Sequence, residues 1–102
     1  DGNPYLVAAG ILSAALEGIK EKAEPGERVN GNAYDAEEYL PAELKFASNL
    51  AHAADALKAS SLARKYMGDN FVDHFVSSRH WEVSEYQRSL NSWQLERYFE
   101  II

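Results

Sequence analysis

Three histidines are the side chains of this sequence best suited to metal binding or proton transfer, so their spacing is the first test of either role. His74 and His80 are six residues apart, which places them about 120° apart around an α-helix of 3.6 residues per turn. Two histidines share a metal ion from one helix when they are four residues apart, and no pair here has that spacing. His52 stands alone further upstream. We therefore predict that all three are surface or packing residues.

Carboxylates can act as general acids or bases, but the pairs in this sequence lack the surroundings that this chemistry needs. Glu37 and Glu38 lie in a polar stretch, and Glu82 and Glu85 lie in a segment with helical periodicity. A catalytic carboxylate needs burial or a like-charged neighbour to shift its pKa. The six glycines are scattered and form no phosphate-binding loop, and there is no cysteine for thiolate or disulfide chemistry. We predict no catalytic, cofactor-binding or metal-binding residue in this chain.

The composition indicates a small folded unit with no nucleic-acid or membrane partner. The chain has 102 residues, of which 46% are hydrophobic and 25% charged, as in globular proteins. Lys and Arg number 10 against 16 Asp and Glu, giving a net charge of -6, whereas nucleic-acid binding needs a basic surface. No apolar run approaches the roughly 20 residues of a membrane span. No signal-peptide pattern is visible, so we expect a cytoplasmic protein.

Residue usage predicts an all-α structure. The sequence contains 15 alanines, no threonine and only nine valines and isoleucines together. Alanine favours helices, whereas β-branched residues favour strands. Asn3 and Pro4 are good first residues for a helix that should reach about Lys22. Apolar side chains surround this helix, so we expect residues 1–23 to be a helix buried on all sides.

The rest of the chain divides into a loop and a helical part. Residues 24–48 contain Pro25, Gly26 and Pro41 among several acidic residues, which predicts a long, exposed, acidic loop. Residues 49–102 should form helices that end in an apolar tail. The expected helices cover about 49–59, 61–66, 69–90 and 93–99.

Polar residues and a glycine mark the ends of these helices. Ser60 or Ser61 should cap a short helix that Gly68 ends, because serine accepts hydrogen bonds from free N–H groups and glycine readily leaves helical geometry. Asn91 or Ser92 should cap the last helix in the same way.

Trp81 does not belong to the apolar stripe of the longest helix. It lies about 120° from Phe75 around that helix. Two interpretations stay open: Trp81 covers another element or a partner, or it is partly exposed and packed under the acidic loop.

The first residue is Asp1, and the single methionine is Met67. We expect the sequence to be part of a longer protein, with a processed mature chain as the alternative. The apolar first helix favours a longer protein, because three helices would give it too little to pack against.

A series of short motifs gives the sequence a family resemblance. Asp-Gly-Asn-Pro-Tyr-Leu at 1–6 is followed by an alanine-rich helix that ends in Glu-Gly-Ile-Lys-Glu-Lys at 17–22. Further pieces follow in order: Gly31-Asn32-Ala33-Tyr34, Leu40-Pro41 with Leu44, Ala53 with Leu57 and Ser60, Gly68-x-x-Phe71-Val72, and Trp93-x-x-Glu96-Arg97-Tyr98. Together they resemble the last segment of glutamine synthetases over essentially the whole chain. The Phe-Val-x-x-Phe and Trp-x-x-Glu-Arg-Tyr pieces look closest to bacterial enzymes that join glutamate to amines, including the γ-glutamylpolyamine branch.

This resemblance implies the helical C-terminal part of an α+β glutamine-synthetase-type catalytic domain. Its reaction is an ATP-dependent condensation in which the γ-carboxylate of glutamate is phosphorylated and ammonia or an amine displaces the phosphate. ATP and Mg or Mn ions belong to the longer enzyme, because the family's metal-ligating glutamates and its arginines precede the Asn-Pro-Tyr turn. The segment itself is then structural and inactive, and its partner is the rest of its own catalytic domain.

Two alternatives to an active ligase stay open. The chain could be an independent α-helical protein-interaction module, or part of a ligase-fold paralogue that has lost activity. The residues upstream of Asp1 would discriminate them: a strand with Glu-x-Arg indicates the ligase, and an initiator methionine indicates the module.

Tyr34 is the one position with an implied modification. Some bacterial members of the family are regulated by nucleotidylation of the loop tyrosine in Asn-x-Tyr, which Tyr34 matches. The family's Leu-Pro-Pro after the Tyr-Asp pair is replaced here by Ala36-Glu37-Glu38. The alternative is an ordinary loop tyrosine packed on the nearest helix.

The chain ends in an apolar tail that should be buried. Tyr98, Phe99, Ile101 and Ile102 are large and apolar, and burial of such side chains contributes roughly 1.5–3 kcal/mol each. They should pack on the chain's own helices or on another subunit. The resemblance implies a homo-oligomer built as a double ring, which favours the contact between subunits.

Overall fold

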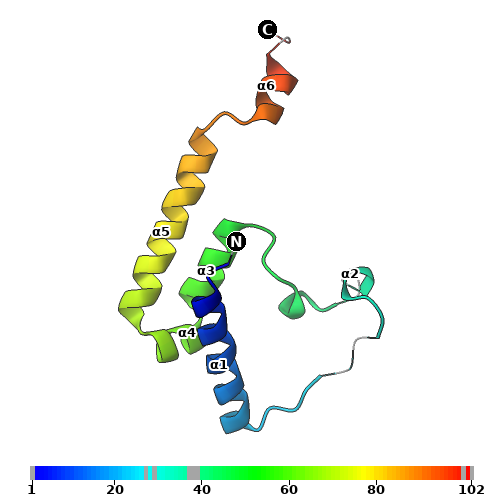
Figure 1. Ribbon diagram of the computed structural model, residues 1–102, viewed down its shortest axis with the longest axis vertical. Coiled ribbons are helices and arrows are strands. Elements are labelled where there is room, and N and C mark those ends of the chain that lie inside the picture. The colour runs from blue at the N-terminus through cyan, green and yellow to red at the C-terminus, as the bar shows by residue number, and fades with distance from the viewer. Residues whose placement is uncertain (1, 27, 29, 37–39, 100, 102) are drawn as a thin grey trace.

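The chain is all-α in a computed structural model that describes residues 2–26, 28, 30–36, 40–99 and 101, and the predicted fold class is confirmed. No strand occurs in these described residues. The elements, in chain order, are α1 (Pro4–Glu21), α2 (Ala33–Ala36), the 3-10 helix η2 (Ala42–Leu44), α3 (Leu50–Ala59), α4 (Ser61–Met67), α5 (Asp69–Arg88) and α6 (Ser92–Tyr98) (Figure 1).

Side-chain caps begin four of the helices. Asn3 Oδ1 accepts from the N–H groups of Tyr5 and Leu6 at the start of α1, and Asn49 Oδ1 accepts from His52 at the start of α3. Ser60 caps α4, as predicted. At α6, the predicted cap Asn91 forms a reciprocal pair with Gln94, each side chain bonding the other's backbone N–H. Such caps satisfy N–H groups that the first helical turn leaves free.

Gly68 separates the two helices α4 and α5. Its φ of 84° lies in the left-handed region that glycine adopts without a steric penalty, so it ends α4 as expected. The next helix, α5, ends at Arg88, two residues before the expected Leu90. The expected loop contains the short helices α2 and η2.

The core lies where α3 packs alongside the first half of α5 (Figure 1). Val72 is fully buried, and Ala54 and Val76 are nearly so. Partly buried apolar residues surround these three: Leu57, Ala63, Met67 and Phe71. This core is small because it uses only one face of α3 and a short stretch of α5.

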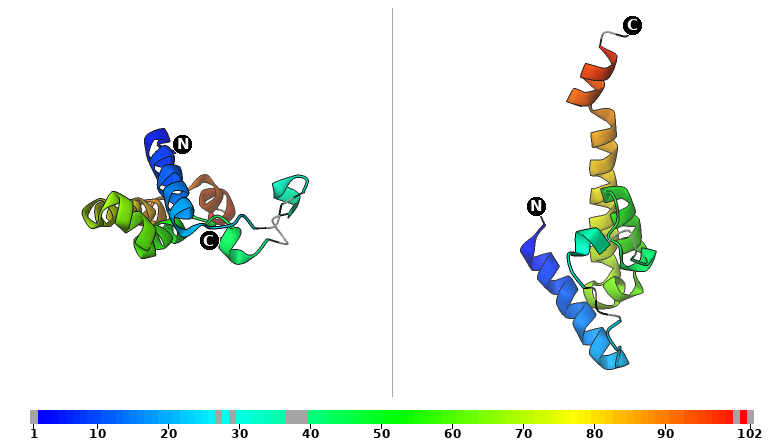
Figure 2. Two further views of the ribbon diagram at one scale, coloured as in Figure 1. Left: turned by 90° about the horizontal axis from the view of Figure 1, so that it is seen from below. Right: turned by 90° about the vertical axis from the view of Figure 1, so that its right-hand side faces the viewer.

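The chain is more extended than a self-contained domain of its size. It measures 61 × 39 × 22 Å, and its radius of gyration is 18.1 Å, against about 13 Å for a compact chain of this length. The accessible surface is 9136 Å², against roughly 5,800 Å² for a compact protein of this mass. The second half of α5 carries α6 away from the other helices (Figure 2). Much apolar surface is therefore left uncovered within these 102 residues.

Helix α1 contributes a large share of that surface. The C-terminal part of α1 contacts α4, while most of the large apolar side chains of α1 face outward. The exposed ones are Tyr5, Val7, Ile11, Leu12, Leu16 and Ile19. Burial of this helix on all sides stays a prediction for the longer protein. No helix within the described residues is both long and apolar enough to cross a membrane.

Candidate functional site

A polar cluster joins α1 to α4. The carboxylate of Glu17 accepts hydrogen bonds from Lys65 Nζ and from the Tyr66 hydroxyl, the latter at 2.7 Å. The same hydroxyl accepts from Lys20 Nζ at 2.9 Å. Both ammonium groups also lie near the face of the Tyr66 ring, at 5.2 and 5.6 Å from its centroid. The cluster thus ties two helices together through one carboxylate and one phenol.

The hydrogen bonds of this cluster shift two pKa values in the directions expected for an ion pair. The bond from Lys65, followed by that from Tyr66, lowers the pKa of Glu17, because both favour the charged carboxylate. The bond to Glu17 raises the pKa of Lys65 for the same reason. Both groups are therefore more firmly charged near neutral pH than isolated side chains. A general acid or base needs the opposite adjustment, so this pair acts as a structural contact.

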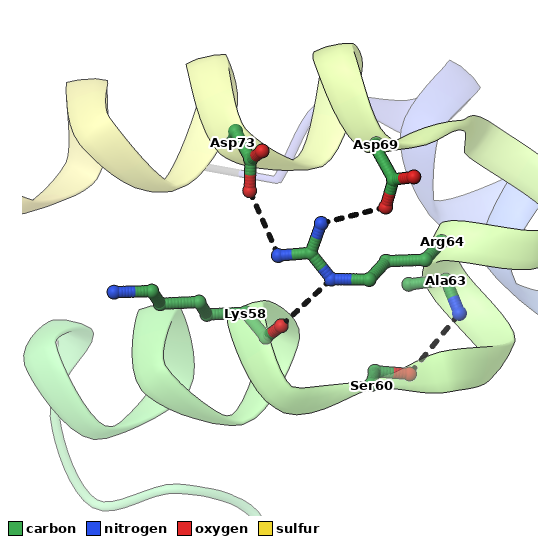
Figure 3. Close-up of polar contacts among 6 residues, drawn as sticks. All are labelled: Lys58, Ser60, Ala63, Arg64, Asp69 and Asp73. Carbon is green, nitrogen blue, oxygen red and sulfur yellow. Dashed lines mark hydrogen bonds and ion pairs between the residues drawn. The ribbon is translucent and has the colours of Figure 1, made fainter.

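A second polar cluster lies at the corner where α3, α4 and α5 meet (Figure 3). Arg64 Nε donates to the carbonyl of Lys58 at 3.0 Å, and the two terminal nitrogens donate to Asp69 and Asp73 at 2.7 Å each. The bond to Asp73, and next the bond to Asp69, raise the pKa of the guanidinium. One side chain thereby links the last turn of α3 to the first two turns of α5. Sequence reasoning missed this role because its three acceptors lie at different separations along the chain.

The three histidines lie at separate places in the structure and do not form a cluster. His80 Nε2 lies 3.1 Å from Asp55 Oδ1 and joins α5 to α3, while His52 Nδ1 lies 3.3 Å from the Ser48 hydroxyl at the start of α3. His74 is exposed on α5. No group of three His, Cys, Asp or Glu side chains within the described residues is arranged to hold a metal ion.

Of the two glutamate pairs named from the sequence, the pair on α5 consists of residues that form separate ion pairs with arginines. Glu82 pairs with Arg79 and Glu85 pairs with Arg88, each three residues apart along α5. Glu37 and Glu38 lie outside the described residues.

Tyr34 is accessible on the short helix α2. Its residue is 86% exposed, and its backbone N–H donates to Asn32 Oδ1 at 3.1 Å. The loop that carries it stands away from the α3–α5 pair (Figure 1). Within the described residues, the Tyr34 side chain is therefore largely exposed and packs on none of the helices.

The apolar tail follows α6 at the end of the molecule farthest from α1 (Figure 2). Phe99 is 81% exposed, and Tyr98 and Ile101 are also exposed, while Ile102 lies outside the described residues. Tyr98 makes an edge contact with Trp93, with ring centroids 6.0 Å apart. Trp81, on α5, is exposed as well. Trp81 and the tail side chains are therefore exposed apolar residues that the described part of the chain leaves uncovered.

Two clefts lie between helices of the described residues, and no sequence pattern predicted either of them. One, of about 710 Å³, lies between the start of α3 and the second half of α5. The other, of about 560 Å³, lies between the start of α1 and the first half of α5. Their walls come from distant segments, so no local motif indicates them.

Comparison with known proteins identifies the family. Residues 1–98 match the family model described as the glutamine synthetase catalytic domain. The chain is 38% identical over 103 residues to type-1 glutamine synthetase 2 of Dictyostelium discoideum, an alignment that covers 100% of this chain and 20% of that protein. It is 37% identical to a glutamate–isopropylamine ligase of a Pseudomonas species, covering 100% of this chain and 22% of that protein. It is 35% identical to a glutamine synthetase of Methanosarcina mazei, covering 98% and 23%.

The chain thus spans about a fifth of the length of the curated relatives it matches. The match to the family model extends from the first residue to Tyr98 in α6. One of these relatives is named a glutamine synthetase and another a glutamate–isopropylamine ligase. By the extent of the family match and the identity to these relatives, the chain belongs to the glutamine synthetase catalytic-domain family.

Proposed function

We propose that this chain is the C-terminal helical part of an ATP-dependent ligase that joins the γ-carboxylate of glutamate to ammonia or an amine. The observation that carries the proposal is the alignment of the whole chain with a protein named glutamine synthetase and with one named glutamate–isopropylamine ligase. Both alignments cover about a fifth of those proteins, so the activity belongs to a longer polypeptide.

The proposed reaction has two steps. A γ-carboxylate oxygen of glutamate attacks the terminal phosphorus of ATP, which forms a γ-glutamyl phosphate and releases ADP. The nitrogen lone pair of ammonia or an amine then attacks the γ-carbonyl carbon, the C–O bond to phosphate breaks, and nitrogen loses a proton to give the amide. Divalent Mg or Mn ions supply charge neutralisation when bound.

This proposal places the ATP and metal sites of that reaction outside these 102 residues. A divalent ion in such a site needs several carboxylate or imidazole ligands, and the described residues gather no group of three. In the two polar clusters, the charged side chains form ion pairs with one another. Glu17 pairs with Lys65, and Arg64 pairs with Asp69 and Asp73. The chain's role is therefore to support a catalytic domain whose reacting groups lie in the rest of the polypeptide.

The partners in this proposal are the rest of the catalytic domain and further copies of the same enzyme in a double ring, in the cytoplasm. The exposed apolar side chains of α1 and of the tail supply two separate surfaces for such contacts. In this proposal, residues outside this chain determine whether the acceptor is ammonia or an alkylamine.

A chimera tests the proposal. Residues 1–102 replace the matching segment of the Dictyostelium glutamine synthetase, and ADP release is measured with glutamate and either ammonia or isopropylamine. We expect turnover above that of the same enzyme lacking the segment. A chimera that assembles without turnover, together with a 102-residue chain that folds alone as a monomer, would support the alternative of an independent helical interaction module.

Tyr34 is the proposed site of nucleotidylation in the longer enzyme. Its exposure and its place in Asn-x-Tyr support this, although Ala36 and the two residues after it depart from the family's Leu-Pro-Pro. Mass spectrometry of the enzyme from cells grown in nitrogen excess should show a Tyr34 peptide heavier by one nucleotidyl group. An unmodified peptide alone would end the proposal.

A further inference from the structure

Helix α1 is joined to the other helices at one end only. Among the helices of the described residues, α1 packs mainly against α4, and α4 in turn packs against α5. The contact lies in the C-terminal part of α1, where Glu17 meets Lys65 and Tyr66. Near its N-terminal end, α1 is separated from α5 by the cleft of about 560 Å³ that Val7 lines. The angle between α1 and α5 therefore depends on the position of α4.

Consecutive residues of α4 make the polar contacts on its two sides. Arg64 donates to two aspartates of α5 at 2.7 Å each (Figure 3). The next two residues, Lys65 and Tyr66, donate to the carboxylate of Glu17 on α1. Successive residues lie about 100° apart around a helix, so one turn of α4 can contact helices on two sides. The two polar clusters are thus neighbours on the same short helix.

Helix α4 is bounded by a turn at each end, so its contacts fix its position. It contains the seven residues Ser61–Met67. Ser60 before it has an extended backbone with ψ of 107°, and Gly68 after it has φ of 84°. Neither end continues into the neighbouring helix. Loss of the Arg64 bonds would therefore let α4 move as a unit between these two turns, and α1 would move with it.

We propose that α4 is a coupling element that sets the angle between α1 and α5, so that breaking the Arg64 corner releases α1. The hydrogen bonds that Arg64 makes within the described residues go to α3 and α5, so this effect on α1 is indirect. The far end of α5 leads to α6 and the apolar tail (Figure 2). Three neighbouring side chains thereby fix where the tail lies relative to α1. The inference concerns the chain's own helices and holds whether or not the longer polypeptide is an active ligase.

Distances between pairs of spin labels test this inference, because the 102 residues contain no cysteine and labels can be placed at chosen sites. Ala8→Cys with Ser77→Cys reports on α1 against α5, and Ala56→Cys with Ser77→Cys reports on α3 against α5. All three positions are exposed. Labelled chains are diluted with an excess of unlabelled chain, so that double electron–electron resonance measures distances within one chain.

Arg64→Met should broaden the distance distribution between positions 8 and 77 about twofold or more, as for a helix released by local opening. The distribution between positions 56 and 77 should not change, because the α3–α5 core stays packed. Arg88→Met is the matched control. It removes an exposed arginine of α5 that pairs with Glu85, and it should leave both distributions unchanged.

Tyr66→Phe tests the other side of α4. It removes only the hydroxyl that bonds Glu17, and it should broaden the same α1–α5 distribution. An unchanged distribution in this variant would overturn the inference, because the contact with α1 would then not depend on that bond.

The remaining outcomes of Arg64→Met also decide the inference. Broadening of both distributions, in a chain that keeps its helical circular dichroism, would show that Arg64 holds the α3–α5 core itself, and would overturn the inference. Broadening of neither would show that other contacts hold α1, with the same result. If Arg64→Met loses its helical signal, Asp73→Asn, which removes the charge of one partner of the corner, decides by the same two distributions.

Discussion

Arg64 and Asp73 are joined across the corner between α4 and α5, with Nη2 2.7 Å from Oδ1. The same guanidinium reaches Asp69 and the Lys58 carbonyl, so three helices meet at one side chain. The planar guanidinium can donate in three directions at once, which an ammonium group cannot do in this geometry. The corner is therefore sensitive to the shape of the side chain as well as to its charge.

Arg64→Lys should lower the thermal midpoint of the 102-residue chain by several degrees, nearly as much as Arg64→Met. Circular dichroism at 222 nm measures the helix loss. Arg88→Lys is the matched control, because Arg88 forms an exposed pair with Glu85 and such pairs contribute little. Arg64→Lys with an unchanged midpoint would show that charge alone holds the corner.

Glu17→Gln should remove an acid-sensitive part of the stability of the α1–α4 contact. The pKa of Glu17 is lowered in the folded chain, so the carboxylate contributes fully above its ordinary value of 4.5 and this contribution is lost as pH falls through the lowered pKa. The unmodified chain should therefore lose protection of its α1 amides below that pH, measured by hydrogen exchange. Glu17→Gln should start less protected and change less, whereas the loop control Glu24→Gln should follow the unmodified chain.

Val72→Ala should destabilise the chain by about 2 kcal/mol or more, because it removes two methyl groups from a fully buried site and leaves a cavity. Urea unfolding followed by circular dichroism measures the change. Val7→Ala is the same chemical change at an exposed position and should stay within about 0.5 kcal/mol. Equal effects at both positions would contradict the assignment of the core to the α3–α5 contact.

The isolated 102-residue chain should self-associate, because α1 and the tail expose large apolar side chains at opposite ends. Light scattering should give a mass above the 11.4 kDa of one chain. Deletion of residues 99–102 combined with Leu12→Lys should lower that mass, whereas Ser77→Lys on α5 should not. A monomer at high concentration would contradict this prediction.

The isolated chain should bind Mg-ATP too weakly for a micromolar dissociation constant. Its described residues gather no three metal ligands, and its glycines form no phosphate cradle. Isothermal titration with Mg-ATP measures this directly. Saturable micromolar binding would contradict the structural role given to these residues.

Local sequence signals predicted the helices α1, α3, α4, α5 and α6 and several of their ends, but not the short helices α2 and η2 within the expected loop. Asn3, Ser60 and Asn91 act on N–H groups within three residues along the chain, so their roles can be predicted without any knowledge of packing. Gly68 ends α4 through its own backbone freedom. The family resemblance, carried by motif order, was likewise a property of the sequence.

Only the tertiary structure showed which surfaces meet. Val72 and Val76 form the core with Ala54, whereas Val83, later on the same helix, is only partly buried and lines the cleft between the start of α3 and the second half of α5. The Tyr66 hydroxyl bonds the Glu17 carboxylate 49 residues away, and the cleft between α1 and α5 brings Val7 near Phe75; no local periodicity specifies either contact. A sequence pattern identifies an apolar face, but whether this chain or another part of the polypeptide covers that face depends on the position of whole helices.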